Sequence, residues 1–299
     1  MSLSEFADVK NQARFATSYK LRECIYKRLK KVAYKEVAKF DVEFAVTKEP
    51  VPFEKRLELE YKPISSYEKW SKSSYECGWF KLTADVPAEY EGQRLAGLAN
   101  LGSEALFVDE NGHALQGLST LMAVIEYTQP ARGKSFFEIT KSAKPGKLEV
   151  WLEAGNNKKD TLRCQSARFN YAKLVTVRDD VVEFYYDYLF LDMLRFVLNG
   201  SKNAKKRKSI VASMRKAIKV VGKDYLPENV QKGREILTKE IESGEDFPFT
   251  LYGIGHAHLD LAWLWPIRET QRKAIRTFAN QVRNIEKHKG YKFGVSQPQ

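Results

Sequence analysis

The chain has 299 residues, of which 43% are apolar and 12% aromatic, and its 50 Lys and Arg exceed its 38 Asp and Glu by 12. These proportions exclude an intrinsically disordered chain, and the sequence contains no run of about 20 apolar residues that could cross a membrane. Its three cysteines are too few and too scattered for a disulfide scaffold, and no secretory signal opens the chain. We therefore expect a cytoplasmic protein that does not interact with a membrane.

The positive charge is concentrated in two stretches. Residues 1–40 carry ten bases and four acids, and residues 199–235 carry eleven bases and three acids. A cluster within the second stretch is compatible with a nucleic-acid patch and consists of Lys202, Lys205, Lys206, Arg207 and Lys208. It lacks the interleaved aromatic residues of nucleic-acid modules, so we expect a solvated connection between helices and no nucleic-acid partner.

The first 177 residues predict a helical arm followed by a β-sandwich. Residues 5–40 contain no Gly or Pro and favour helix. Beyond residue 50 apolar side chains alternate with a period of two, which predicts strands at Leu57–Tyr61, Phe80–Val86 and Leu148–Leu152. Asn111-Gly112 predicts a tight hairpin turn between two further strands.

A helical connecting segment is predicted over residues 178–246. Apolar side chains recur at helical spacing from Val181 to Leu198, and Asn199-Gly200 then provides a stop signal. Two further helices are predicted over residues 209–221 and 228–241, and residues 243–248 have the composition of a linker.

Residues 247–299 predict the start of another domain. The pattern is a strand from Phe249 to Gly255, an amphipathic helix over residues 267–288 and a second strand over residues 291–295. This order is typical of a βαβ unit that opens an α/β barrel or an open sheet, which makes the whole chain α+β. In the helix we expect the aliphatic side chains to be buried and the basic ones to lie mostly outside, namely Arg272, Lys273, Arg276 and Arg283.

Three potential metal ligands follow the first of these strands. His256, His258 and Asp260 are spaced at i, i+2 and i+4, so on a strand all three side chains would share one face. Imidazole and carboxylate are the ligands that zinc takes in catalytic sites. The alternative is a pair of hydrogen-bonded histidines at a strand end. Trp263 offers an indole face that suits a sugar ring, whereas core packing is our interpretation of Trp265.

The segment from Gly255 to Pro266, with Glu269-Thr270, Arg272-Lys273 and the final Ser296–Gln299, resembles the start of the catalytic domain of glycoside hydrolase family 38. These enzymes are retaining, zinc-dependent α-mannosidases, and the resemblance is closest to their cytosolic and bacterial branch. It implies that His258 and Asp260 are two of four zinc ligands, that Trp263 lies beneath the mannose ring, and that His256 supports the site without ligating the metal. In the family, zinc binds mannose hydroxyls while a carboxylate attacks the anomeric carbon and an acid protonates the leaving oxygen.

The resemblance also implies functional residues that are not in this sequence. The family's nucleophilic Asp, which is also a zinc ligand, and its last His ligand both lie well beyond the first motif, whereas this sequence ends 39 residues after Asp260. The terminal Gln297-Pro298-Gln299 departs from the family pattern, where Ala is usual in place of Pro. We therefore expect the N-terminal part of an α-mannosidase that acts on terminal α-mannosides of oligosaccharides or glycans and is inactive alone. The alternatives are a metal-dependent amidohydrolase or phosphoesterase and a carbohydrate-binding or assembly module.

Overall fold

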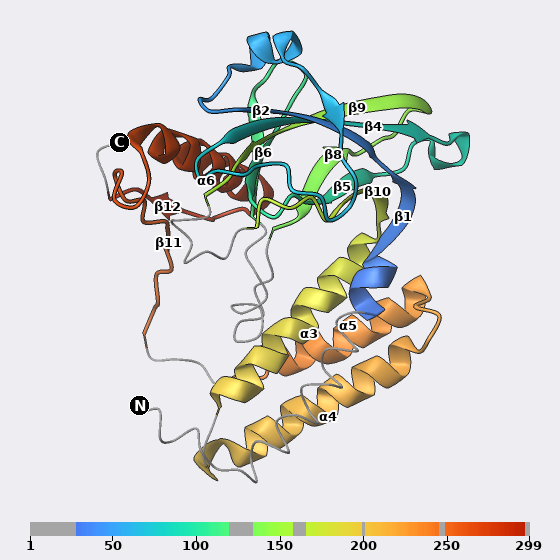
Figure 1. The fold of residues 1–299 in the computed structure, drawn as a ribbon. Coiled ribbons are helices and arrows are strands. Elements are labelled where there is room, and N and C mark those ends of the chain that lie inside the picture. Colours follow the sequence, from blue (N-terminus) through green and yellow to red (C-terminus); the bar gives the residue numbers. More distant parts are fainter. Residues whose placement is uncertain (1–27, 120–133, 158–165, 199–200, 245–248, 297–299) are drawn as a thin grey trace. The chain divides into compact units, whose positions relative to one another are not determined.

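The computed structural model describes residues 28–119, 134–157, 166–198, 201–244 and 249–296. The chain divides into two compact units, one made of residues 1–35 and 177–247 and the other of residues 36–176 and 248–299. The first unit is mainly helical and the second contains the sheets (Figure 1), so the chain combines helix and sheet as predicted. Several predicted features lie outside the described residues: the helix over 5–27, the stop at Asn199-Gly200, linker residues 245–248 and the end at 297–299.

The helical unit has a helical segment at residues 28–33, and its other elements are α3 (Asp179–Val197), a 3-10 turn (Ser201–Asn203), α4 (Ala204–Val221) and α5 (Pro227–Glu242). Their apolar faces enclose one core, whose fully buried members include Leu29, Phe184, Leu191, Ile210 and Leu237. Pro227 begins α5, where its fixed φ suits the first helical position and its missing N–H leaves no intrahelical bond unmade. The three predicted helices are confirmed, although α4 begins five residues earlier than expected.

The basic cluster at residues 202–208 is part of this helical packing. Lys202 lies in the 3-10 turn between α3 and α4, whereas the other four residues lie in the first turns of α4, where Lys and Arg are good helix formers. Lys206 Nζ lies 2.9 Å from Glu240 Oε1 on α5 and donates a hydrogen bond to Ser243 Oγ. The same carboxylate accepts hydrogen bonds from Ser209 and Ser213.

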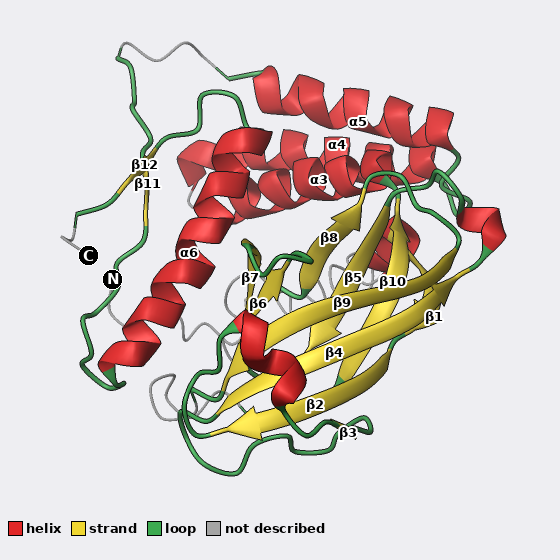
Figure 2. Ribbon diagram, turned by 90° about the horizontal axis from the view of Figure 1, so that it is seen from above, coloured by secondary structure: helices red, strands yellow, loops and turns green. Residues whose placement is uncertain are grey.

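Two antiparallel sheets form the predicted sandwich. The four-stranded sheet has the order β1 (Tyr34–Lys39), β10 (Tyr171–Val177), β5 (Leu95–Asn100), β8 (Phe136–Thr140). The six-stranded sheet has the order β3 (Lys62–Pro63), β2 (Asp41–Thr47), β4 (Cys77–Val86), β9 (Gly146–Gly155), β6 (Glu104–Val108), β7 (Ala114–Ser119). The long strands β2, β4 and β9 run side by side (Figure 2). Alternate residues of both sheets, such as Phe44, Phe80, Leu152 and Leu174, fill the core between them.

The N-terminal part of the sandwich departs from the sequence prediction at two places. The arm is not helical up to residue 40: its helix ends at residue 33 and β1 follows, because pairing with β10 and packing of Val37 and Ala38 on the core outweigh local helix preference. The predicted strand at Leu57–Tyr61 is also wrong. Residues Phe53–Glu58 form a 3-10 helix, and Leu59 and Tyr61 pack against the outer face of the six-stranded sheet beside Trp79 and Trp151.

The predicted hairpin is confirmed between β6 and β7. Gly112 has φ +86°, and a Cβ there would lie 2.5 Å from the Phe53 ring, so both conformation and space require glycine. The Asp109 carboxylate accepts hydrogen bonds from the backbone N–H groups of Asn111 and His113 and closes the turn.

The last segment adds a helix and a short parallel strand pair to the sandwich unit. Strand β11 (Gly255–His256) pairs in parallel with β12 (Phe293–Gly294), and α6 (Ile267–Lys287) lies between them in sequence. The predicted strand from Phe249 is therefore much shorter, because only two of its residues have a neighbouring strand among the described residues. The apolar side chains before it are largely exposed, namely Phe249, Leu251, Tyr252 and Ile254.

Helix α6 packs against β7 of the sandwich at Gly117. A Cβ at Gly117 would lie 2.5 Å from the Arg276 carbonyl oxygen, so glycine permits the close approach. The Gly117 N–H donates a hydrogen bond to Asn280 Oδ1 at 3.1 Å, and the Asn280 side chain donates back to the Gly117 carbonyl. This reciprocal pair fixes the helix at one point on the strand. Across the described ranges, no helix is both long and apolar enough to span a bilayer.

Candidate functional site

Helix α6 buries the face that the sequence analysis placed outside. Arg272, Lys273 and Arg276 are only 8%, 8% and 5% exposed, whereas Ile275 and Val282 are 47% and 53% exposed. The prediction for this helix is therefore inverted. The physical reason is the partner surface, because the sandwich presents carboxylates to α6 where an ordinary core would present apolar side chains.

Three buried cations on α6 meet three carboxylates. Arg276 is central: its Nη1 donates to Glu269 at 2.6 Å and to Glu104 on β6 at 3.0 Å, and its Nη2 lies 3.3 Å from Glu153 on β9. Lys273 Nζ donates to Glu104 at 2.7 Å. The charges balance, which is the condition under which ions can be buried without a large free-energy cost.

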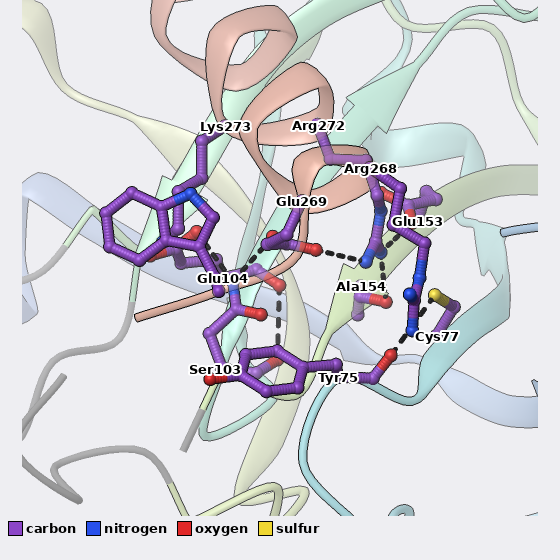
Figure 3. A network of polar contacts seen from close by, with 12 residues as sticks. Tyr75, Cys77, Ser103, Glu104, Glu153, Ala154, Arg268, Glu269, Arg272 and Lys273 are labelled. Carbon is purple, nitrogen blue, oxygen red and sulfur yellow. Dashed lines mark hydrogen bonds and ion pairs between the residues drawn. The ribbon is translucent and has the colours of Figure 1, made fainter. Parts of the chain in front are cut away.

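Arg272 completes this ion network and ties it to the backbone (Figure 3). Its guanidinium donates to Glu269 at 2.6 Å, to the Ala154 carbonyl at 2.7 Å and to the Glu153 carboxylate. At the other sheet, Arg283 near the end of α6 lies 3.1 Å from Glu138 on β8, so Arg283 is also partnered and not simply solvated. The helix is therefore joined to both sheets of the sandwich.

The electrostatic environment keeps Glu269 and Arg276 charged. Burial by itself would raise the pKa of Glu269, but the charges of Arg276 and Arg272 outweigh it and hold that pKa below its ordinary value. Burial likewise opposes the charge of Arg276, yet Glu269, Glu153 and Glu104 raise its pKa. Both residues are therefore ionised at neutral pH.

A ten-residue loop, residues 257–266, leads from β11 into α6, and Thr270 on the first turn of α6 holds it. The Thr270 hydroxyl accepts hydrogen bonds from the Ala262 N–H and from Trp265 Nε1, each at 2.9 Å, and donates to the Asp260 carbonyl at 3.3 Å. Lys273 Nζ lies 4.7 Å from the centre of the Trp265 ring, a cation–π contact. The loop therefore rests on the helix whose buried face is the ion network.

The structure brings two of the predicted site residues together on this loop. His258 Nε2 lies 2.9 Å from Asp260 Oδ1, and these side chains are 65% and 36% exposed. Trp263 follows with 69% of its surface exposed, and its ring meets Trp265 edge to face at 6.0 Å. An imidazole, a carboxylate and an accessible indole face thus share one short loop.

His256 lies apart from this pair. Its Nε2 is 2.8 Å from Ser296 Oγ, on the segment that follows β12. The three-ligand face expected from spacing alone is not formed, because β11 ends at His256 and strand alternation does not continue to His258 and Asp260. Within the parts of the chain that the structure describes, no group of three or more His, Cys, Asp or Glu could hold a metal ion.

The donor set fits zinc in type but supplies only part of a complete site. Imidazole nitrogen and carboxylate oxygen are both zinc ligands, and both side chains are open enough to turn toward an ion. Catalytic zinc sites generally have three protein ligands, so His258 and Asp260 would need at least one further donor.

Sequence reasoning missed the residues that support this loop. Thr270 was named only as part of the family resemblance, without a role. The carboxylates Glu104 and Glu153 were not singled out, and neither was Tyr75, whose hydroxyl donates to the Leu264 carbonyl. One signal was present: Glu269, Arg272, Lys273 and Arg276 have the i, i+3, i+4, i+7 spacing of a buried helix face. Tyr75 has no such signal because it lies 189 residues from its partner.

Two family models match the chain in the order expected from its sequence. The model described as "Alpha-mannosidase, jelly roll domain" matches residues 37–168, which contain most strands of the two sheets. The model described as "Glycosyl hydrolases family 38 N-terminal domain" matches residues 248–299, which carry the loop and α6. Residues 248–299 are therefore similar to the N-terminal domain of glycoside hydrolase family 38. The sequence resemblance to this family is therefore confirmed, and the family is one of enzymes.

Curated α-mannosidases extend the similarity over most of the chain. Alpha-mannosidase G of Dictyostelium discoideum is 28% identical over 94% of this chain, and the alpha-mannosidase of Saccharomyces cerevisiae is 26% identical over 82%. Alpha-mannosidase 2C1 of Mus musculus is 23% identical over 85%. The matches cover 26%, 24% and 24% of those proteins, so this chain spans about a quarter of the length of these relatives.

Proposed function

We propose that this chain provides the N-terminal region of a retaining, zinc-dependent α-mannosidase that removes terminal α-mannosides from oligosaccharides or glycans. The observation that carries the proposal is the pairing of His258 with Asp260 beside the exposed indole of Trp263 on one loop. His258 and Asp260 would hold the zinc ion, and Trp263 would bind the sugar. When bound, zinc supplies a Lewis acid for the hydroxyl groups of mannose.

Each residue of the loop has a separate task in this proposal. The indole of Trp263 packs against the apolar C–H face of the mannose ring, which excludes water from that face and orients the sugar. His256 supports the site through the segment after β12, as its contact with Ser296 indicates. Neither task involves proton transfer, so these residues bind and orient the substrate.

The nucleophilic carboxylate, the acid and the other zinc ligands are proposed to come from the rest of the whole enzyme. The exposed aliphatic stripe of α6, which includes Ile275, Val282 and Ile285, supports this view, as do the exposed side chains before β11. Apolar surfaces of this kind are normally covered by other protein. We propose that residues 247–299 open an α/β barrel-type catalytic domain that covers them, after a helical arm with a β-sandwich (1–177) and a helical connecting segment (178–246).

The test is hydrolysis of an aryl α-mannoside by the full-length enzyme that contains these residues. We expect activity with retention of configuration, its loss on chelation and its return with zinc. His258→Ala and Asp260→Asn should each lower activity by about a hundredfold or more, because each removes a metal ligand. His113→Ala, at the exposed β6–β7 hairpin, is the matched control and should leave activity unchanged.

Other outcomes would favour other functions. Hydrolysis of an amide or a phosphoester in place of the mannoside would point to a metal-dependent amidohydrolase or phosphoesterase. Retention on a mannan matrix after removal of residues 249–299, without hydrolysis by the full-length enzyme, would favour a carbohydrate-binding module. Turnover of the mannoside by residues 1–299 alone would contradict the proposal that the nucleophile lies elsewhere.

A further inference from the structure

The loop that carries Asp260 and Trp263 has a strained backbone at its centre. Ala262 has φ +64° and Trp263 has φ +56°, so two consecutive residues with side chains adopt the left-handed region. This conformation is unfavourable for residues other than glycine and persists where the surroundings enforce it. The strain occurs at the proposed sugar-binding tryptophan, so the contacts that enforce it also decide where the indole lies.

One of these contacts is the hydroxyl of Thr270, which is used to its full capacity. A hydroxyl has one donor and two acceptor positions, and Thr270 fills all three with the Ala262 N–H, Trp265 Nε1 and the Asp260 carbonyl. Thr270 is 4% exposed, so water does not readily replace a lost bond. The hydroxyl therefore fixes the backbone of Asp260 and the strained segment at the same time.

The other contact comes from the sandwich. The Tyr75 hydroxyl donates to the Leu264 carbonyl, on the far side of the strained pair from the Ala262 N–H. The Tyr75 backbone is itself held, because its N–H donates to the Asn156 carbonyl at 2.7 Å just before β4 begins. Helix α6 is fixed on β6 and β9 by the ion network. Both supports of the loop are thus anchored on the same sandwich.

We propose that Thr270 and Tyr75 are positioning residues that hold residues 257–266 in the shape that presents Asp260 to the metal and Trp263 to the sugar. The role of the sandwich is then to set the geometry of residues 257–266. The role of the loop in binding metal and sugar rests on the proposed function, whereas the role of Thr270 and Tyr75 in holding the loop conformation does not.

The first test measures backbone hydrogen exchange in the 299-residue chain without metal, in peptides that cover residues 257–266. Thr270→Val removes the hydroxyl at nearly constant shape and should speed exchange of the Ala262 amide by roughly tenfold or more. Thr270→Ser keeps the hydroxyl and should stay close to the wild type. Tyr75→Phe should give a smaller, several-fold increase around Leu264.

Matched controls separate this role from general loosening. Thr277→Val is the control for Thr270→Val, because it makes the same substitution elsewhere on α6. Tyr67→Phe is the control for Tyr75→Phe, because Tyr67 lies in the same region of the sandwich and is exposed. Neither should change exchange in residues 257–266. If Thr270→Val exchanges like the wild type, or if Thr270→Ser exchanges as fast as Thr270→Val, the positioning role is wrong. Should Thr270→Val not fold, Thr270→Ser and Tyr75→Phe still decide the question.

The second test measures zinc affinity of the full-length enzyme by competition with a chelator. Thr270→Val should weaken binding by about ten- to a hundredfold, as expected when the support of a metal ligand is removed, and Thr270→Ser should restore it. Equal zinc affinity in Thr270→Val with faster exchange would overturn the role of Thr270 toward the metal. A wild-type enzyme that binds no zinc would instead refute the proposed function and leave the exchange result as the test of the loop.

Discussion

Helices α5 and α6 are both amphipathic, yet they bury opposite kinds of face. Helix α5 buries Val230 and Leu237 in the core of the helical unit. Helix α6 buries Arg272, Lys273 and Arg276 against the sandwich and exposes its aliphatic stripe. The comparison teaches that an amphipathic pattern establishes two faces, whereas the chemistry of the partner surface decides which of them is buried.

The two interfaces also differ in what they require of their geometry. Apolar side chains gain free energy from burial in many arrangements, so an aliphatic interface tolerates small shifts. Buried charges are stable only where each one meets its partners. The ion network of α6 therefore fixes the helix in one position, and with it Thr270 and the loop that Thr270 holds.

The largest expected effect comes from removing one member of the ion network. Arg276→Met leaves Glu269, Glu104 and Glu153 without their common partner, and the free energy of unfolding should fall by about 3–5 kcal/mol. This loss is measured by urea unfolding, with tryptophan fluorescence as the signal. Arg268→Met on the same helix is the control, because the partly exposed pair of Arg268 and Glu49 should contribute at most about 1 kcal/mol. Equal losses in the two variants would contradict the larger contribution of the buried ion network.

A core truncation in α5 provides the comparison on the aliphatic side. Leu237 is fully buried, and Leu237→Ala should lower the free energy of unfolding by about 2–5 kcal/mol through lost burial and a cavity. Because no charge is involved, this loss should be the same at neutral and mildly acidic pH in urea unfolding of the variant and the wild type. A loss that changes steeply with pH would mean that α5 packing is not mainly apolar.

Acid should weaken the α6 interface selectively. The folded-state pKa of Glu269 lies below its ordinary value of 4.5, so its stabilisation is present above that pH and is lost as pH falls through the folded pKa. We expect the urea midpoint to fall progressively as pH drops below about 4.5. Glu269→Gln should have a lower urea midpoint than the wild type at neutral pH, and its midpoint should fall less as the pH is lowered. An identical pH profile in both proteins would exclude Glu269 as the titrating group.

The smallest expected effect concerns the exposed stripe of α6. In the 299-residue chain, Val282→Ser should change the free energy of unfolding by less than about 0.5 kcal/mol, because Val282 is exposed. In the full-length enzyme the same change should cost about 1–3 kcal/mol if a catalytic domain covers the stripe. Thermal or urea unfolding of both proteins measures the contrast. A small cost in both would mean that nothing packs there.

The elements that could be predicted from sequence are those whose signals are local. Helix α5 begins at Pro227 and α3 follows its apolar spacing, so their positions were predictable from residue type. The alternation at Leu57–Tyr61 failed because apolar alternation also occurs in an irregular segment that packs on a sheet face, as Leu59 and Tyr61 do after the 3-10 helix. Pairing decides between these alternatives, and pairing partners are distant in sequence.

The candidate site shows the same limit. The motif around His258 and Asp260 was visible from residue types and family resemblance, but the expectation that His256 would share their face required a longer strand than β11. The support from Tyr75 arises only when the sandwich and the loop are folded together. Chemistry was therefore easier to predict than the contacts that position it.

We propose that the loop between β11 and α6 supplies ligands to a catalytic zinc ion. The most direct test is anomalous X-ray diffraction at the zinc edge from crystals of the full-length enzyme. We expect an anomalous peak within about 2.0–2.2 Å of His258 and Asp260, beside the indole of Trp263. A zinc peak that contacts neither residue, in an enzyme that is active on α-mannosides, would contradict it.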